Sequence, residues 1–103
     1  MKAKIGRDGW ICFWCPGCNC AHRVPVKPLH HSGWVFNGDL EKPTLSPSIL
    51  VRYPPGTPDT PDNPHPRCHS FVRDGKIQLL SDCTHQLAGK TVDLPEWTKD
   101  EYL

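Results

Sequence analysis

Six cysteines stand in the chain, and two of them, Cys15 and Cys18, flank a Pro-Gly turn. Two thiolates with this spacing can bind one ion from a single tight loop, and Zn²⁺ usually takes its second pair of ligands from a distant segment. One later segment offers Cys68, and another runs from Cys83 to His85. The pattern predicts one structural zinc bound by Cys15, Cys18, Cys68 and Cys83, with His85 as the competitor for the fourth place.

Disulfides or inert buried thiols are the alternative reading of these cysteines. The N-terminal residues lack the apolar core that an export signal needs. We therefore expect a cytoplasmic protein, in the host cytoplasm if a phage encodes it, where thiols stay reduced and cysteine clusters favour metal. Cys12 and Cys20 lie beside the first pair, but four thiolates so close together would crowd one ion. These two are interpreted as ordinary small apolar side chains.

A serine, a histidine and an aspartate suggest a second kind of chemistry. A carboxylate beside an imidazole is the orienting half of an acyl-transfer triad, and His69 with Asp82 offers that pair. Ser48 is the candidate nucleophile, in a proline-stiffened stretch that also contains Ser46. The chain has no Gly-x-Ser-x-Gly motif. Serines near proline are common in turns, and a histidine near an aspartate often only satisfies a buried polar group. From spacing alone, the non-catalytic interpretation is therefore favoured over catalysis.

Several other enzyme classes are excluded by missing residues. No His-x-Glu element precedes the Cys-x-x-Cys pair, as a zinc deaminase requires, and His-Glu-x-x-His is also absent. A glycine loop that could cradle a phosphate is missing too. A zinc-activated water remains open as an alternative if one thiolate is not a ligand, because a site of four thiolates has no free position.

Composition limits the size and the partners of the protein. At 103 residues the chain is one domain, spanning 1–103, and its hydrophobic content of 37% leaves it in need of a metal staple. A net charge of +1 without a basic stripe argues against a nucleic-acid partner, and no apolar run approaches the length of a membrane span. We expect a protein substrate or partner.

The elements that must position these residues are predicted to be strands. Twelve prolines exclude long helices, and short stretches rich in β-branched and aromatic residues recur between turn residues. These stretches cover residues 10–14, 23–26, 34–36, 48–53, 69–73, 76–80 and 90–94. The prediction is an all-β fold: a small antiparallel β-domain stapled by a zinc site, with little or no helix. Residues 54–67 hold six prolines and are predicted to form an exposed loop, either a binding arm or, as the favoured reading, a solvated spacer.

One hairpin links the two candidate sites. Asp74-Gly75 is a strong two-residue turn signal, and it predicts that Val72 pairs with Ile77 and Ser70 with Leu79. Because side chains alternate across a strand, one face of the hairpin would carry Cys68, Ser70, Val72, Ile77, Leu79, Ser81 and Cys83. The other face would carry His69, Phe71, Leu80 and Asp82, and a cover is expected on both faces. His85 has the same parity as Cys83.

A series of motifs in order carries a resemblance to a known family. They are Phe13 to Cys18 followed by His22, then Trp34 to Asp39, Pro43 to Ser48, Cys68 to Phe71, Asp74 to Ile77 and Asp82 to Gly89. Together they resemble the small phage and bacterial zinc-binding proteins catalogued as domain-of-unknown-function family 6527. Members of that family occur in bacterial operons for ubiquitin-like proteins, as serine-dependent peptidases.

The resemblance implies a zinc-stapled hydrolase that acts on a ubiquitin-like protein or its conjugates. In that reading Ser48 attacks the acyl carbonyl, His69 takes its proton and Asp82 orients His69, with His85 and His22 as alternatives for the base and Asn37 as a donor to the oxyanion. A second hypothesis, from a different class, is a non-catalytic zinc-binding β module of phage origin that mediates protein–protein interaction.

Overall fold

Two antiparallel sheets make up the part of the chain that the computed structural model describes, residues 1–52 and 67–98. The first sheet has the order β1-β2-β3 and contains β1 (Ala3–Ile5), β2 (Trp10–Cys15) and β3 (Cys20–Pro25). The second has the order β4-β5-β6-β7-β8 and contains β4 (Val35–Phe36), β5 (Leu45–Arg52), β6 (Arg67–Arg73), β7 (Lys76–Leu79) and β8 (Thr91–Asp93). These described residues contain no helix, which confirms the predicted all-β class.

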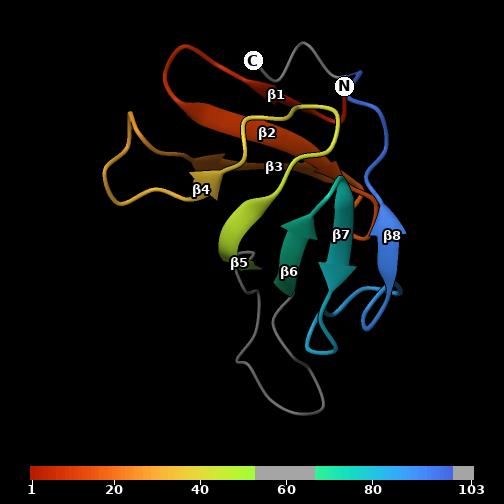
Figure 1. The fold of residues 1–103 in the computed structure, drawn as a ribbon. Helices are drawn as coiled ribbons and strands as arrows, with labels where there is room; N and C mark the ends of the chain where they lie inside the picture. Colours follow the sequence, from red (N-terminus) through yellow and green to blue (C-terminus); the bar gives the residue numbers. More distant parts are fainter. Residues whose placement is uncertain (53–66, 99–103) are drawn as a thin grey trace.

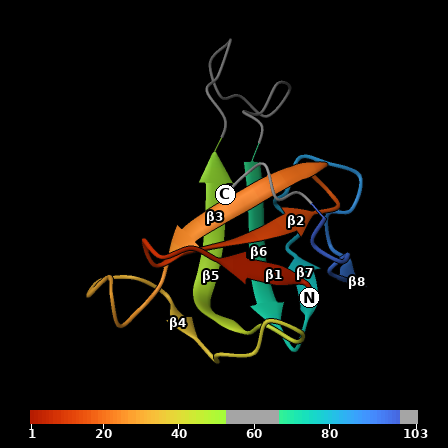
Figure 2. The same ribbon diagram turned by 90° about the horizontal axis from the view of Figure 1, so that it is seen from above.

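The two sheets pack as layers with a core between them. Figure 1 shows the three-stranded sheet as a layer above the row β5 to β8, and Figure 2 shows β2 and β3 crossing over β5 and β6. Buried and more exposed residues alternate along β3, β6 and β7, as one-sided burial of a sheet requires. The largest fully buried side chains are Phe13, Ile11, Leu45, Ile49, Ile77, Leu79 and Leu94.

The Asp74-Gly75 hairpin has the predicted register. Ser70 pairs with Leu79 and Val72 with Ile77. Asp74 and Gly75 have φ angles of 54° and 76°, the left-handed conformation that a two-residue hairpin turn of this kind needs at both positions. The strand β6 that carries His69 is therefore the middle strand of its sheet, hydrogen-bonded on both sides.

Several strands differ from the sequence-based prediction; β3, for example, covers Cys20–Pro25, whereas the prediction was 23–26. β1 was not predicted, because three residues of mixed polarity carry no periodic signal. β5 begins at Leu45 rather than at residue 48, and it runs through Pro47 by means of a β-bulge between Leu45 and Ile49. The predicted loop 54–67 lies outside the described residues, apart from Arg67, which begins β6.

In the described part of the chain the outer face of the five-stranded sheet is open, which corrects the expected cover on both faces. The side of β6 and β7 that carries Val72 and Ile77 is fully buried, whereas Phe71 and Leu80 on the other side are only partly buried. No further layer covers this face within residues 1–52 and 67–98. The residues predicted to share that face with His69 are therefore accessible.

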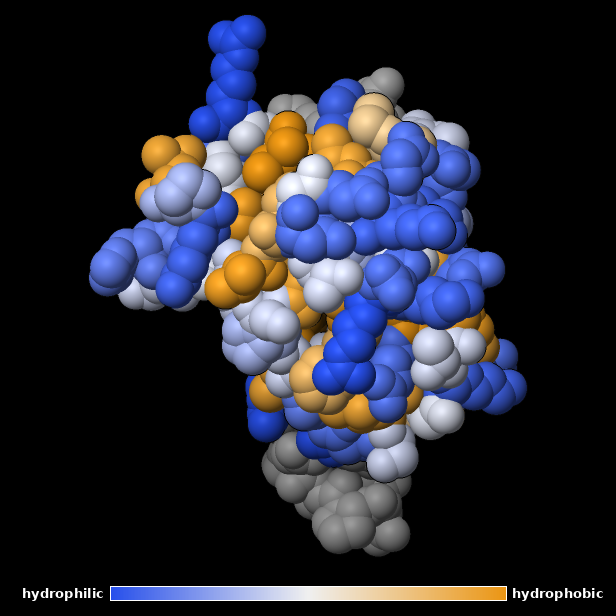
Figure 3. Space-filling view, viewed as in Figure 1, coloured by the Kyte–Doolittle hydropathy of each residue, from blue (hydrophilic) through white to orange (hydrophobic). Residues whose placement is uncertain are grey.

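The described surface is mainly polar. Figure 3 shows one side of the molecule with apolar surface in limited patches among hydrophilic residues. The large apolar side chains that are clearly exposed are Met1, Ile5, Leu29, Val35 and Leu50. Among the described residues, no helix is long and apolar enough to cross a membrane.

Candidate active site and metal centre

Ser48, His69 and Asp82 lie in contact on the open face of the five-stranded sheet. The Ser48 hydroxyl oxygen is 3.1 Å from Nε2 of His69, and Nδ1 of the same ring is 3.2 Å from Oδ2 of Asp82. An imidazole between a hydroxyl and a carboxylate is the geometry of the serine-hydrolase triad, which recurs on unrelated folds in different chain orders. The structure thus brings together the three residues that the sequence singled out.

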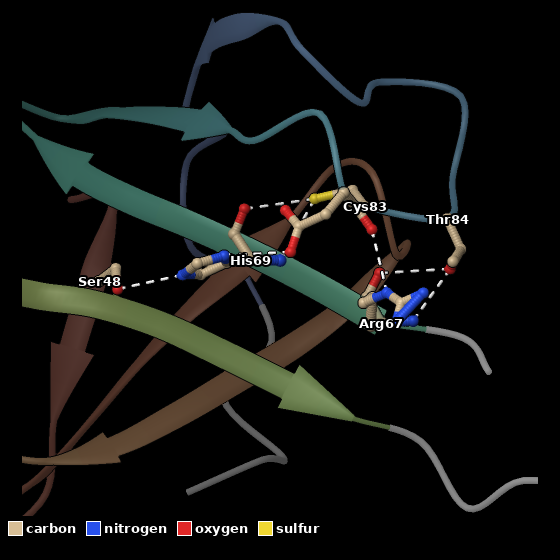
Figure 4. A network of polar contacts seen from close by, with 6 residues as sticks. Ser48, Arg67, His69, Cys83 and Thr84 are labelled. Atoms are coloured by element: carbon tan, nitrogen blue, oxygen red, sulfur yellow. Dashed lines mark hydrogen bonds and ion pairs between the residues drawn. The ribbon is translucent and has the colours of Figure 1, made fainter. Parts of the chain in front are cut away.

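Three neighbouring elements position these side chains. Ser48 is the last residue of the bulge in β5, and His69 is in the middle of β6 (Figure 4). Asp82 lies in the turn that follows β7. Leu50 is the residue of β5 directly opposite His69, and Ser48 is two positions before it, so Ser48 and His69 are diagonal neighbours on one face. The bulge gives β5 three residues between Leu45 and Ile49 where β6 has only Phe71.

Hydrogen bonds between β6 and the turn that carries Asp82 hold this turn against the strand. The Cys83 sulfur lies 3.2 Å from the His69 amide nitrogen and donates to the His69 carbonyl at 3.3 Å. Arg67 donates from Nε to the Asp82 carbonyl at 3.1 Å, and its own carbonyl accepts from the Thr84 amide. Figure 4 shows these contacts from β6 to the loop after β7. The turn that carries the Asp82 carboxylate is therefore hydrogen-bonded to β6, the strand that also carries the His69 imidazole.

The indole of Trp34 fixes the backbone at the candidate nucleophile. Its Nε1–H points at two successive carbonyls of the bulge, at 3.0 Å from the Pro47 oxygen and 3.3 Å from the Ser48 oxygen. A carbonyl that accepts such a bond cannot rotate freely. The peptide that carries the Ser48 side chain is thus held from the side opposite β6.

The site is open to solvent on one side. The His69 side chain is 28% exposed and the Asp82 side chain 51%. A substrate can reach the hydroxyl and the imidazole, while the half-exposed carboxylate is solvated and interacts less strongly with the ring than a buried one would. The arrangement is that of an accessible site and not of a buried polar pair.

The other residues considered for catalysis lie elsewhere. The Asn37 amide donates to the Lys42 carbonyl, and its oxygen accepts from the Asp39 and Thr44 amides, so this side chain organises its own loop. His22 is buried in the three-stranded sheet, where its ring packs edge-on against Phe13.

A second cluster consists of three sulfurs and one imidazole. Cys15, Cys18, Cys68 and His85 each offer one ligand atom, and these atoms all lie within 4.8 Å of one another. The sulfurs of Cys15 and Cys68 are 3.8 Å apart, and Nε2 of His85 is 3.5 Å from the Cys68 sulfur. Three thiolates with one histidine is a usual ligand set of structural zinc. The cluster can hold a metal ion, consistent with zinc.

The fourth member of this cluster is His85 and not Cys83, which corrects the predicted set. The prediction extended the alternation of β7 through Ser81 to Cys83, but β7 ends at Leu79 and the chain turns, with the Cys83 amide bonded to the Leu80 carbonyl. Beyond the end of a strand the period of two no longer decides which face a side chain takes. The Cys83 sulfur instead contacts the His69 backbone. His85, which has the same parity, is the fourth member of the cluster.

The chemistry of the donor atoms fits a divalent cation. The hydrogen bond between the two sulfurs lowers the pKa of Cys15, and the same contact, with burial, raises the pKa of Cys68. A cation bound at this place would stabilise both sulfurs as thiolates. The Cys18 amide also donates to the Cys15 sulfur at 3.4 Å, a supporting contact of the kind that orients metal ligands.

Comparison with known proteins gives a match to a protein family. Residues 1–80, most of the chain, match the family described as the bacterial ubiquitination-like system serine protease, BubE. The chain belongs to the BubE family. Neither the curated proteins nor the solved structures that were compared give a match.

The match to the BubE family supports the predicted link to a protease of bacterial ubiquitin-like operons, although it does not bear on the designation as family 6527. It covers Ser48 and His69, together with Cys15, Cys18 and Cys68, and ends before Asp82. In this BubE family chain, Asp82 and His85 lie outside the matched residues, and their positions at the two sites are therefore known from the structure alone.

Gly17 is a further site residue, which sequence reasoning treated only as a turn former. A Cβ at Gly17 would lie 2.5 Å from Nε2 of His85, far inside contact distance. The His85 ring can reach the cysteines only because position 17 has no side chain. The Pro-Gly pair is visible in the sequence, but the His85 ring that packs on Gly17 comes from a segment beyond β7. No local sequence pattern predicts this contact.

Proposed function

We propose that this member of the BubE family is a serine protease whose triad is Ser48, His69 and Asp82. The observation that carries the proposal is the unbroken chain of contacts from the Ser48 hydroxyl through both nitrogens of His69 to the Asp82 carboxylate, at 3.1 and 3.2 Å. The description of the family as a serine protease supports the same reaction class.

Each residue of the triad has one role in the reaction. His69 takes the hydroxyl proton on Nε2 as the Ser48 oxygen attacks the scissile carbonyl, and Asp82 accepts the Nδ1–H bond that holds the required tautomer. His69 then gives the proton to the leaving amine, which departs and leaves an ester on Ser48. Water, deprotonated by His69, attacks the ester, releases the acid and restores the hydroxyl.

The metal cluster is proposed to be structural. Cys15, Cys18, Cys68 and His85 would hold one Zn²⁺, which supplies stability to the fold when bound. Four protein ligands fill a tetrahedral zinc site, so the chemistry is assigned to the triad. Cys68 precedes His69 directly in β6, and His85 follows Asp82 by three residues. The same two segments therefore carry half of the cluster and two thirds of the triad.

A ubiquitin-like protein, or a conjugate of one, is proposed as the substrate. The support is the description of the family as part of a bacterial ubiquitination-like system. The open face around His69 can accept a macromolecular chain, whereas a site for a small substrate is usually a closed pocket.

Reaction with a fluorophosphonate probe tests the proposal. The native protein should be labelled on Ser48, and Ser48→Ala should abolish labelling without a loss of folding or metal content. Ser46→Ala is the matched control, because Ser46 is exposed in the same strand two residues away and lies outside the triad. It should label at the native rate.

Removing the nucleophile or the base should lower peptide cleavage by several orders of magnitude. His69→Ala should therefore also lose labelling. Labelling that persists in Ser48→Ala would refute Ser48 as the nucleophile. A native protein that the probe does not label at all would refute the serine mechanism and favour the non-catalytic β module.

A further inference from the structure

Among the described residues, the strand that carries Ser48 has an unpaired edge. β4 pairs only Phe36 with Leu45 and Val35 with Ser46, so within the described residues no strand lies beside β5 after Ser46 on that side. Figure 2 shows β5 extending well past β4. An unpaired strand edge presents amide and carbonyl groups that another extended chain can bind.

The hydrogen-bonding pattern shows which groups of β5 point outwards. The His69 carbonyl accepts from the Leu80 amide at 2.9 Å, and the His69 amide contacts the Cys83 sulfur, so both groups face the β7 side. Leu50 is the partner of His69 across β5 and β6. In an antiparallel ladder such a pair is of the type that exchanges no hydrogen bonds, and the amide and carbonyl of Leu50 are therefore directed away from β6, to the unpaired edge.

The same logic applies two residues further on. Arg67 uses its amide on the Thr84 hydroxyl oxygen at 2.9 Å and its carbonyl on the Thr84 amide at 3.1 Å. Its partner in β5 is Arg52. Leu50 and Arg52 thus place their amides and carbonyls on one line along the edge, with the spacing of alternate residues that a β-strand partner needs.

The edge is closed at its other end, next to the candidate nucleophile. The Trp34 indole occupies the carbonyls of Pro47 and Ser48 on this side of β5. A chain paired with Leu50 and Arg52 cannot continue in the plane of the sheet past that indole. It must leave the edge at the level of Ser48, and the open face with His69 is the side where the hydroxyl lies.

We propose that the substrate binds as an extended segment that adds a strand to the edge of β5, paired with the backbone of Leu50 and Arg52, and then crosses Ser48. This inference rests on the proposed function, and it names the substrate class as an unfolded tail or linker of a protein and not a folded surface. Main-chain bonds supply the affinity in this mode, and side-chain contacts supply selectivity. Leu50, 47% exposed on the face of His69, offers such an apolar contact.

Proline at Leu50 tests the pairing directly. Leu50→Pro removes the outward N–H and leaves the bonds between β5 and β6 intact, because proline is tolerated on an edge where its nitrogen faces away from the sheet. The matched control is Thr91→Pro. Leu79 donates to the Lys90 carbonyl and Leu94 to the Gly75 carbonyl, so the Thr91 amide also points outwards, from the opposite edge strand β8.

The measurement is kcat/KM on the best-cleaved member of a quenched decapeptide library, together with the rate of fluorophosphonate labelling. Leu50→Pro should label like the native protein and lose about tenfold in kcat/KM, the effect of one main-chain hydrogen bond. Thr91→Pro should change both by less than about twofold. Native cleavage by Leu50→Pro would overturn the proposal, as would a labelled native enzyme that cleaves no member of the library.

A second measurement needs no variant and covers the case in which Leu50→Pro does not fold. The native enzyme is given the same decapeptide with one backbone nitrogen methylated at a time. A strand-paired peptide loses cleavage at every second position on one side of the scissile bond, and sensitivity without that alternation contradicts the pairing. Failure of the native protein to label on Ser48 instead overturns the proposed function itself, and this inference with it.

Discussion

At the scale of single residues, the place in the cluster that spacing suggested for Cys83 is taken by its competitor, His85. The Cys83 sulfur lies against the amide and the carbonyl of His69 and so braces the residue proposed as the base. His85 reaches the Cys68 sulfur across the space left open by Gly17. Cys83, which contacts the backbone of the proposed active site, and His85, which belongs to the metal cluster, are therefore only two positions apart.

Metal content should separate these two roles. We expect His85→Ala to lower the affinity for zinc at least tenfold, because it removes a ligand, whereas Cys83→Ala should bind one zinc per chain as tightly as the native protein. Metal analysis after dialysis against a series of competing chelators measures both. Loss of zinc from Cys83→Ala with retention by His85→Ala would restore Cys83 as the fourth ligand.

Most of the site was predictable from residue types and from one turn. Asp74-Gly75 set the register of β6 and β7, and alternation then put His69 on the face opposite Cys68. The prediction was wrong at Cys83, because alternation was carried beyond the last residue of β7 into a turn. The roles of Trp34 and Gly17 depend on contacts between segments distant in sequence, and no local periodicity contains that information.

At the scale of elements, the metal cluster joins three separate parts of the fold. Cys15 ends β2, Cys18 lies in the turn before β3, Cys68 is in β6, and His85 follows β7. The three-stranded sheet and the strand of the proposed base are therefore linked at one point. The sequence predicted the pairing of β6 and β7, which a turn signal joins. It did not predict β1, because this short strand is defined only by its pairing with β2.

Removal of the proposed zinc ion should unfold the protein. Structural zinc contributes on the order of 10 kcal/mol, which equals the whole stability of an ordinary small domain. Dialysis against a strong chelator, or the substitution Cys15→Ala, should abolish the far-ultraviolet circular dichroism of the strands, and added Zn²⁺ should restore it only in the native chain. A fully folded protein shown by metal analysis to be zinc-free would contradict this expectation.

At the scale of the whole molecule, the two layers depend on a small core. Phe13 is fully buried between the sheets, and it is the largest of the fully buried side chains. It lies in β2, in the sheet that contributes none of the three triad residues. A substitution at Phe13 therefore changes the packing of the core without removing a side chain of the proposed triad.

Phe13→Ala should lower the free energy of unfolding by about 3–5 kcal/mol, since it removes a large buried ring and leaves a cavity. Leu29→Ala is the control, because Leu29 is 63% exposed, and its cost should stay within about 0.5 kcal/mol. Urea titration of the metal-loaded protein measures both. Equal stability of the two variants would show that the sheets do not pack as described.

The approach of Cys15 to Cys68 has a consequence for the unfolded chain. The two residues are 53 positions apart, and their sulfurs are 3.8 Å apart in the folded protein. An ion that holds both closes a loop of that length, and in the chain-entropy treatment of cross-links such a closure removes about 4 kcal/mol of freedom from the denatured ensemble. The cluster would thus act as a cross-link that, unlike a disulfide, forms and persists without an oxidant.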